Sequence, residues 1–364
     1  MQIRDILNEI EAYAPLALQE NYDNCGVQVG NDRTEVSGVL IAIDITEELI
    51  DEAIAKNCNL IIAHHPLIFK GVKKLTGKDY IERCIIKAIK HDIVLYAAHT
   101  NLDNVKTGVS YRMAQKLGLK NIRVLAPQAG MLMKLATFVP LKKAEMVRIA
   151  LFAAGAGKIG NYSSCSFNAL GEGTFKANEN ANPYVGDINE MHTEVETKVE
   201  VIFPRYLQNN ILRALMEAHP YEVPAYDLIE LANVTEESGS GVIGEFEHAL
   251  SPVNALKRIK ETFGVPCLKH SPVCKESVKS VALCGGSGSF LYPQAMANGA
   301  DLFVTGEIKY HDFFVHENRI ILAEIGHYES EQFTKDLIYD IIREKFSNFA
   351  IHLSEVKTNP INYI

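Results

Sequence analysis

Histidine and carboxylate residues occur in this sequence in pairs whose spacing suits metal binding. His99 and Asp103 stand four residues apart after an apolar run, and His327 and Glu331 repeat this spacing, with both members shifted by the same 228 positions. Residues four apart share one face of a helix, so each pair can present two ligands together. Imidazole and carboxylate ligands suit a borderline divalent metal such as zinc, manganese or iron, and a carboxylate can bridge two ions. The alternative for each pair is a surface position, with a histidine that caps a helix and an acid that is solvated.

A third cluster, His64 and His65, follows the apolar run 60–63 and precedes Pro66. Such a run fits a strand buried on both faces, and open α/β sheets bind ligands at the carboxyl ends of their strands. At a strand end, two adjacent imidazoles can each reach a different ion of a close pair. Taken alone, the dipeptide is more often a hydrogen-bonded structural feature. Three such clusters behind three predicted strands favour one shared metal site.

The elements that would position these clusters recur along the chain. From residue 36 to 118, apolar runs alternate with helical-period stretches, which is typical of parallel strands with crossover helices. The segment 52–65 aligns with 294–307 at an offset of 242 positions, and the alternation recurs from Val278 until a long predicted helix over 330–346. The sequence therefore predicts an α/β fold with two duplicated lobes, whose strand ends together build the metal site.

The segment between the two lobes has a different pattern. It predicts strand and helix over 133–155, paired strands over 161–167 and 172–177, and strand, helix and strand over 197–231. This order is that of a ferredoxin-like α+β domain, and the Gly and Ser residues at 234–241 predict a flexible junction. The predicted division is a first metal-binding lobe over 1–128, an inserted domain over 129–238 and a second metal-binding lobe over 239–364.

A glycine-rich loop follows the strand predicted from Val278. It consists of Gly285, Gly286, Ser287 and Gly288 and leads into a predicted helix. Backbone N–H groups at such a place can bind an anion such as phosphate. Because the loop has neither the lysine of a P-loop nor dinucleotide-binding spacing, a plain tight turn is an equal alternative.

Composition limits the class of protein. A chain of 364 residues suffices for two or three domains, and its formal charge of −9 argues against a nucleic-acid partner. Seven cysteines without a C-x-x-C motif fit a reducing cytosol better than a disulfide framework. The N-terminal stretch predicts a charged amphipathic helix, and no run of ~18 uncharged apolar residues occurs. The sequence predicts a cytoplasmic protein without a membrane partner.

One cysteine, Cys25, lies in a polar segment and raises the possibility of a nucleophile working with the histidines. The neighbouring residues Asn21, Asp23 and Asn24 predict a turn against the core. A packing role for the small thiol is therefore favoured.

Taken as a set, the motifs closely resemble the Nif-three-like family, whose members are often named GTP cyclohydrolase 1 type 2 homologues. The matching stretches are NYDNCGVQVG, LIIAHHPLIF, YAAHTNLDN, GGSGSF, DLFVTGEIKYHD and GHYESE. They fall within roughly 1–128 and 239–364. The resemblance implies a dinuclear metal centre between two similar lobes and a toroidal homohexamer enclosing a cavity. It also implies that the middle segment is the PII/CutA-like insertion of longer bacterial members.

The resemblance further implies roles for individual residues. Carried over by position, the ligands of two divalent ions fall on His64, His65, Asp103, His327 and Glu331. Glu331 would bridge the ions, and His99 falls on a further family histidine that would support the ligands or transfer protons.

Two functions remain open from the sequence. A pair of ions can lower the pKa of a water molecule and stabilise charge on a substrate, which suits a hydrolase of a nucleotide or other phosphorylated small molecule. His99 or His311 would then move protons. The alternative is a non-catalytic metal-binding or regulatory protein whose insertion senses a ligand or contacts a partner. Five ligands shared by two ions leave room for water, which favours catalysis.

Overall fold

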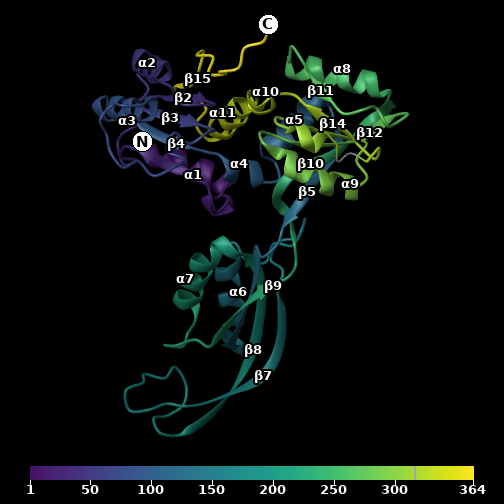
Figure 1. The fold of residues 1–364 in the computed structure, drawn as a ribbon. Coiled ribbons are helices and arrows are strands. Elements are labelled where there is room, and N and C mark those ends of the chain that lie inside the picture. The colour runs from purple at the N-terminus through teal and green to yellow at the C-terminus, as the bar shows by residue number, and fades with distance from the viewer. Residues whose placement is uncertain (315–316) are drawn as a thin grey trace. The chain divides into compact units, whose positions relative to one another are not determined.

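The computed structural model describes residues 1–314 and 317–364 and shows a mixed α/β fold (Figure 1). The chain divides into two compact units, a larger one formed by Met1–Pro127 with Glu236–Ile364 and a smaller one formed by Gln128–Thr235. Within the described ranges, no helix combines the length and the apolar character needed to cross a membrane.

The first sheet of the larger unit has helices on both faces. In spatial order it contains β1 (Gly26–Val29), β4 (Val94–Ala97), β3 (Leu60–Ala63), β2 (Val39–Ala42) and β15 (Ile351–Leu353). Strands β2, β3 and β4 are parallel and every residue in them is buried, because both faces are covered. Helices α1 (Ile3–Tyr13) and α11 (Thr334–Lys345) pack on one face, and α2 (Glu47–Ala55) and α3 (Tyr80–Lys90) pack on the other.

The second sheet repeats this arrangement at its centre. In spatial order it contains β11 (Lys269–His270), β14 (Ile321–Glu324), β13 (Leu302–Thr305), β12 (Val278–Cys284), β10 (Thr235–Leu250) and β5 (Lys120–Gln128). Strands β12, β13 and β14 are parallel, and β11 is antiparallel to β14 as β1 is to β4. Helices α5 (Val109–Leu117) and α8 (Pro252–Phe263) cover one face, and α9 (Tyr292–Ala297) covers the other.

Two single-turn helices follow corresponding strands of the two sheets. Helix α4 (Thr100–Asn104) follows β4, and α10 (His327–Glu331) follows β14. The long helix predicted over 330–346 is found as α11, but it is interrupted near its start, because α10 ends at Glu331 and α11 begins at Thr334. The break has a packing cause: Phe333 packs against the core of the second sheet, whereas α11 buries its apolar face against the first.

The smaller unit is an antiparallel sheet with two helices on one face. Its elements follow in the chain as β6 (Leu132–Pro140), α6 (Ala144–Ala153), β7 (Phe167–Lys176), β8 (Met191–Pro204), α7 (Gln208–Ala218) and β9 (Tyr226–Leu231). The strand order across the sheet is β7-β8-β6-β9, and α6 and α7 bury their apolar faces with β6 and β8. The strand pair predicted at 161–167 and 172–177 is wrong. Residues 167–176 form one strand that pairs with β8, beyond the segment 177–190.

The chain leaves and re-enters the larger unit at neighbouring positions. A Cβ atom at Gly239 would lie 2.8 Å from the Cα of Pro127, so only glycine fits there, and its φ of +150° also favours glycine. The flexible junction predicted over 234–241 is wrong, because these residues begin β10 and Ser238 also bridges to Val105. Gly239 and Gly241 instead allow the backbone to approach neighbouring strands closely.

Because Pro127 and Gly239 lie side by side, we expect the smaller unit to be removable. Deleting residues 128–235 and joining the ends with a short flexible linker should leave a folded larger unit that still binds metal, since loops between close ends cost little closure entropy. Circular dichroism and metal analysis of the deletion variant check this. An unfolded or metal-free product would show that the smaller unit is integral to the fold.

Candidate metal centre

Six polar side chains meet at the carboxyl ends of the parallel strands of the larger unit. His64 and His65 directly follow β3, and His99 follows β4 and precedes α4, which carries Asp103. From the other sheet, α10 contributes its first and last residues, His327 and Glu331. The ends of parallel strands in two mixed sheets thus bring together side chains that are more than 200 positions apart in the sequence.

The carboxylate of Glu331 faces two different groups with its two oxygens. Its Oε1 lies 3.6 Å from Nε2 of His64, which in turn lies 3.8 Å from Oδ1 of Asp103. Its Oε2 lies 3.0 Å from Nε2 of His65 and 3.2 Å from Nε2 of His327. The side chain is only 4% exposed. A buried carboxylate therefore stands between two sets of ligand-type atoms.

Every histidine of the cluster is oriented by an acceptor on its Nδ1 atom. The partners of Nδ1 are the Ala98 carbonyl for His64 at 2.8 Å, Asp44 for His65 at 2.7 Å, Asp23 for His99 at 2.8 Å and Glu307 for His327 at 2.8 Å. Each contact directs the opposite nitrogen, Nε2, toward the cluster. Histidines that bind metals are held in this way, with the outer nitrogen donating to a carboxylate or carbonyl.

The three supporting carboxylates, Asp23, Asp44 and Glu307, were not predicted from the sequence as parts of the site. Asp44 follows β2 and Glu307 follows β13, so the rule that placed the histidines at strand ends also reaches them. Asp23 lies in the segment predicted as a turn, where no strand points to it. It also accepts from the hydroxyl and the backbone N–H of Thr100. Only the folded chain brings it to His99.

Burial and mutual attraction shift the proton affinities of these groups. Burial lowers the pKa of His65, but the nearby carboxylates of Asp44 and Glu331 outweigh this and raise it to about 10. Burial likewise lowers the pKa of His327, and its contacts with Glu331 raise it to about 9. Burial raises the pKa of Glu331, yet the surrounding histidines hold it well below its usual range. The centre thus favours positive charge around a buried anion.

The donor set fits divalent metal ions. Nε2 of His64 and Oε2 of Glu331 are buried and have no hydrogen-bond partner among residues 1–314 and 317–364. Buried polar atoms normally have partners, so these two atoms fit a site that binds a metal ion. Nε2 atoms of His65 and His327 also lie 3.3 Å apart, an approach that a shared cation would stabilise. Imidazole nitrogens and carboxylate oxygens are ligands of zinc, manganese and iron.

The glycine-rich loop packs beside the cluster, but its N–H groups are already used. The N–H groups of Gly285, Gly286 and Gly288 donate to the hydroxyls of Ser110, Ser330 and Thr305. Because these three donors are engaged within the chain, the contacts favour the plain tight turn over the phosphate-binding hypothesis. A Cβ atom at Gly286 would lie 2.4 Å from Oε1 of Glu331, so the loop glycine makes room for that carboxylate. Ser287 donates its hydroxyl to Glu307.

A cavity of about 460 Å³ opens onto the cluster. Its lining includes His99, Asp103, His327 and Glu331 together with the glycine-rich loop and the exposed rings of Tyr22 and Phe290. Pockets of this size hold small organic molecules. The cluster is therefore accessible to a ligand.

Two other residues considered from the sequence lie outside this chemistry. His311 is exposed, packs against Tyr310 and Phe314 and is not among the described residues that line the cavity, so its proton-transfer role stays a prediction. Cys25 donates its thiol to Asp23, and burial raises its pKa to about 12. Because the thiolate is the nucleophile, such a thiol is inert at neutral pH.

Comparison with known proteins shows the family of this chain. The sequence pattern of Duf34/NIF3 (NGG1p interacting factor 3) matches residues 1–360. The chain belongs to the Duf34/NIF3 family. The resemblance predicted from the motifs is thereby confirmed.

Relatives and solved structures of this family match along their whole length. A GTP cyclohydrolase 1 type 2 homolog from Halalkalibacterium halodurans is 38% identical, covering 99% of this chain and 98% of that protein. One from Staphylococcus aureus is 35% identical over 100% of both. The crystal structure of a Bacillus cereus protein related to NIF3 superposes with a TM-score of 0.87 at 36% identity, covering 100% of this chain and 99% of that one.

The raised histidine pKa values predict how metal binding by this Duf34/NIF3 chain depends on pH. Ligation needs the neutral imidazole, so protons compete with metal, and apparent affinity should rise with pH until His65 and His327 lose their protons near pH 9 to 10. Isothermal titration calorimetry in buffers of different ionisation enthalpy should show proton release on binding. An affinity that stays flat between about pH 6 and 9 would contradict this.

The same pKa values predict that the stability of the metal-free protein falls as the pH rises, whereas its metal affinity rises. An unfolded histidine has a pKa of about 6.5, and folding raises the pKa of His327 to about 9 and that of His65 to about 10. The protonated histidines therefore stabilise the fold fully below about pH 6.5, and this stabilisation is lost as the pH rises through 9 and 10. The melting temperature of chelator-treated protein should therefore fall over this range, and added metal should restore it. Equal melting curves with and without metal at high pH would argue against ligation by these histidines.

Proposed function

We propose that the six-residue cluster is a dinuclear metal centre with two divalent ions of zinc, manganese or iron. His64 and Asp103 would hold one ion, His65 and His327 would hold the other, and Glu331 would bridge both. The observation that carries this proposal is the buried Glu331 carboxylate, whose two oxygens face these two groups at 3.0 to 3.6 Å. The nitrogen and oxygen donors, and the two buried atoms without partners, support it.

We further propose that the centre is the active site of a hydrolase acting on a nucleotide or other phosphorylated small molecule. Two bound ions lower the pKa of a water molecule and stabilise negative charge on a substrate. His99 lies beside the two ligand histidines, with ring centroids 5.2 Å from His64 and 5.4 Å from His65. Since Asp23 fixes its Nδ1, its Nε2 is positioned to accept or donate a proton. The rings of Tyr22 and Phe290 offer apolar contacts to a planar base.

The proposal is tested by a turnover screen of the metal-loaded protein. GTP, other nucleotides, cyclic nucleotides and phosphate esters would be incubated with protein reconstituted with Mn²⁺, Zn²⁺ or Fe²⁺. The proposal expects product formation that chelation abolishes and that metal restores. Loss of that dependence, or no turnover of any substrate class, would favour the rival function.

That rival is a non-catalytic metal-binding or regulatory protein. One observation favours it: the smaller unit holds a pocket of its own, of about 680 Å³, which could bind a regulatory ligand. Under this proposal the metals would be structural or cargo, and ligand binding by the smaller unit would be the primary event.

We also propose how the fold arose and how the chain assembles. The shared order of β1-β4-β3-β2 and β11-β14-β13-β12 supports a duplicated α/β lobe. The β-α-β-β-α-β order of the smaller unit supports an inserted ferredoxin-like domain of the PII/CutA-like kind. On the family resemblance we also propose a cytoplasmic toroidal homohexamer. Light scattering of the purified protein measures the subunit number.

A further inference from the structure

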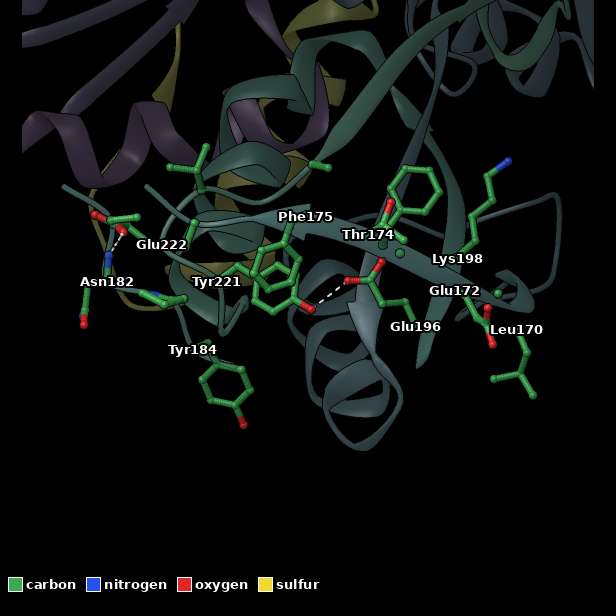
Figure 2. Close-up of a pocket in the computed structure, with 18 of the residues that line it drawn as sticks. Leu170, Glu172, Thr174, Phe175, Asn182, Tyr184, Glu196, Lys198, Tyr221 and Glu222 are labelled. Atoms are coloured by element: carbon green, nitrogen blue, oxygen red, sulfur yellow. Dashed lines mark hydrogen bonds between the residues drawn. The ribbon is translucent and has the colours of Figure 1, made fainter. Parts of the chain in front are cut away.

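The smaller unit contains a pocket on the face of its sheet that the helices leave uncovered. Its floor is the hairpin of β7 and β8, and residues of the segments 177–184 and 221–225 complete its wall. Figure 2 shows the labelled side chains around this space. A hydrogen bond of 2.9 Å from the N–H of Asn182 to Glu222 ties the two wall segments together. The pocket has a volume of about 680 Å³, and this contact holds part of its wall in place.

The floor of the pocket is made of small residues. Ala169, Gly171 and Gly173 alternate along β7 and so share one face of the strand, opposite Lys198, Glu196 and Glu194 of β8. A Cβ atom placed at Gly171 would meet no atom within 4 Å, which shows that the space above it is open. A ligand can thus lie directly against the backbone of β7.

A buried carboxylate faces this space without a positive partner. Glu196 is 8% exposed, and its Oε1 accepts a hydrogen bond of 2.7 Å from the hydroxyl of Tyr221. Among the residues that the structure describes, no Lys, Arg or His nitrogen lies within 4.0 Å of its carboxylate, and its Oε2 has no donor. A Cβ atom at Gly173 would lie 2.2 Å from that Oε2, so glycine makes room for the carboxylate.

The nearby basic groups are all engaged elsewhere. Lys198 pairs with Glu200 at 2.7 Å, and His192 pairs with Glu194 at 3.0 Å. His219 accepts the backbone N–H of Tyr221 on Nδ1 and contacts the Phe138 carbonyl through Nε2, which fixes the neutral tautomer. Since a buried charge is costly unless it is paired, a cationic ligand from outside the chain would stabilise this carboxylate.

Aromatic rings surround the carboxylate. Tyr221 lies in edge contact with Phe175 and tilted against Tyr184, with ring centroids 6.0 and 6.2 Å apart, and Phe138 also lines the space. The other acids of the lining, Glu172 and Glu222, outnumber its single lysine. Aromatic faces beside a carboxylate attract organic cations, whereas an anionic ligand would be repelled.

From these contacts we propose that the pocket of the smaller unit binds an organic cation, namely an ammonium group carried on an apolar or aromatic body. The ammonium group pairs with Glu196, and the body lies over Gly171 and Gly173 against the rings of Phe175 and Tyr221. This site is separate from the metal centre and needs no metal for binding.

The test uses full-length protein and isothermal titration calorimetry with 2-phenylethylammonium, tetramethylammonium and spermidine. Uncharged 2-phenylethanol and anionic phenylacetate are controls for 2-phenylethylammonium, because both carry the same phenyl ring without the positive charge. We expect at least one ammonium compound to bind, with 2-phenylethanol about tenfold or more weaker than its amine and phenylacetate without binding. The proposal is overturned if none of the three cations binds, or if the alcohol or the acid binds as tightly as the amine.

Three variants locate the binding. Glu196→Gln should weaken binding about tenfold or more, whereas Glu194→Gln, on the same face of β8 but outside the lining, should leave it unchanged. Gly171→Leu should fill the floor and abolish binding while the melting temperature holds, because its Cβ meets no neighbour. Binding that survives Gly171→Leu would place the cation elsewhere and overturn the proposal, even if Glu196→Gln proved unstable.

Discussion

Replacing Glu331 by glutamine is expected to lower the content of both metal ions, from about two per chain to below one. The amide keeps the size of the side chain but removes the charge that faces His64 on one side and His65 and His327 on the other. Because the bridging carboxylate would supply an anionic ligand to both ions, losing its charge weakens the binding of both. Elemental analysis of protein purified without chelator measures the result.

A matched control is available on the same short helix. Glu329 is also buried, but its carboxylate accepts from Asn359 and not from the cluster. Glu329→Gln should therefore retain both ions. Two ions in Glu331→Gln, or loss of a single ion, would contradict the bridging role.

Replacing His99 by alanine is expected to separate metal binding from turnover. Five other ligand-type side chains remain around the ions, so both ions should stay bound, while the rate should fall on the order of 10²-fold if the imidazole transfers a proton. The contact with Asp23 makes this role specific to His99, since it fixes the ring with Nε2 toward the cluster. Metal analysis and steady-state kinetics on the same preparation measure both effects.

The control for this variant is His91→Ala, which removes an exposed histidine at the end of α3. It should change neither metal content nor rate. Nitrogens of His64, His65 and His99 all lie within 4.8 Å of one another, so His99 could instead be a ligand. Loss of an ion from His99→Ala would show that, and would contradict the proton-transfer role. An unchanged rate would remove His99 from catalysis.

The central strands and the histidines at their ends could be predicted from the sequence, because buried parallel strands are continuous apolar runs. The runs ending before His64 and His99 are β3 and β4, and those ending before Glu307 and His327 are β13 and β14. Their polar residues stand out because they interrupt apolar sequence at the edge where ligands bind. The same physical rule would have included Asp44 and Glu307.

Other features depended on contacts that leave no local pattern. Asp23 reaches His99 across 76 positions, and its segment shows only turn chemistry. The glycines of the loop at 285–288 resemble a phosphate-binding turn, but serine and threonine hydroxyls from other elements accept from the N–H groups of its three glycines. The break at Phe333 arises because neighbouring residues pack in different cores. Helical periodicity along the sequence cannot show this.

The most direct test of the metal centre is a crystal structure of protein purified without chelator, with anomalous scattering recorded at the absorption edges of zinc, manganese and iron. We expect two anomalous peaks about 3.5–4 Å apart. One should lie at His64 and Asp103, the other at His65 and His327, and Glu331 should contact both. A single peak, or two peaks that Glu331 does not join, would contradict the dinuclear centre.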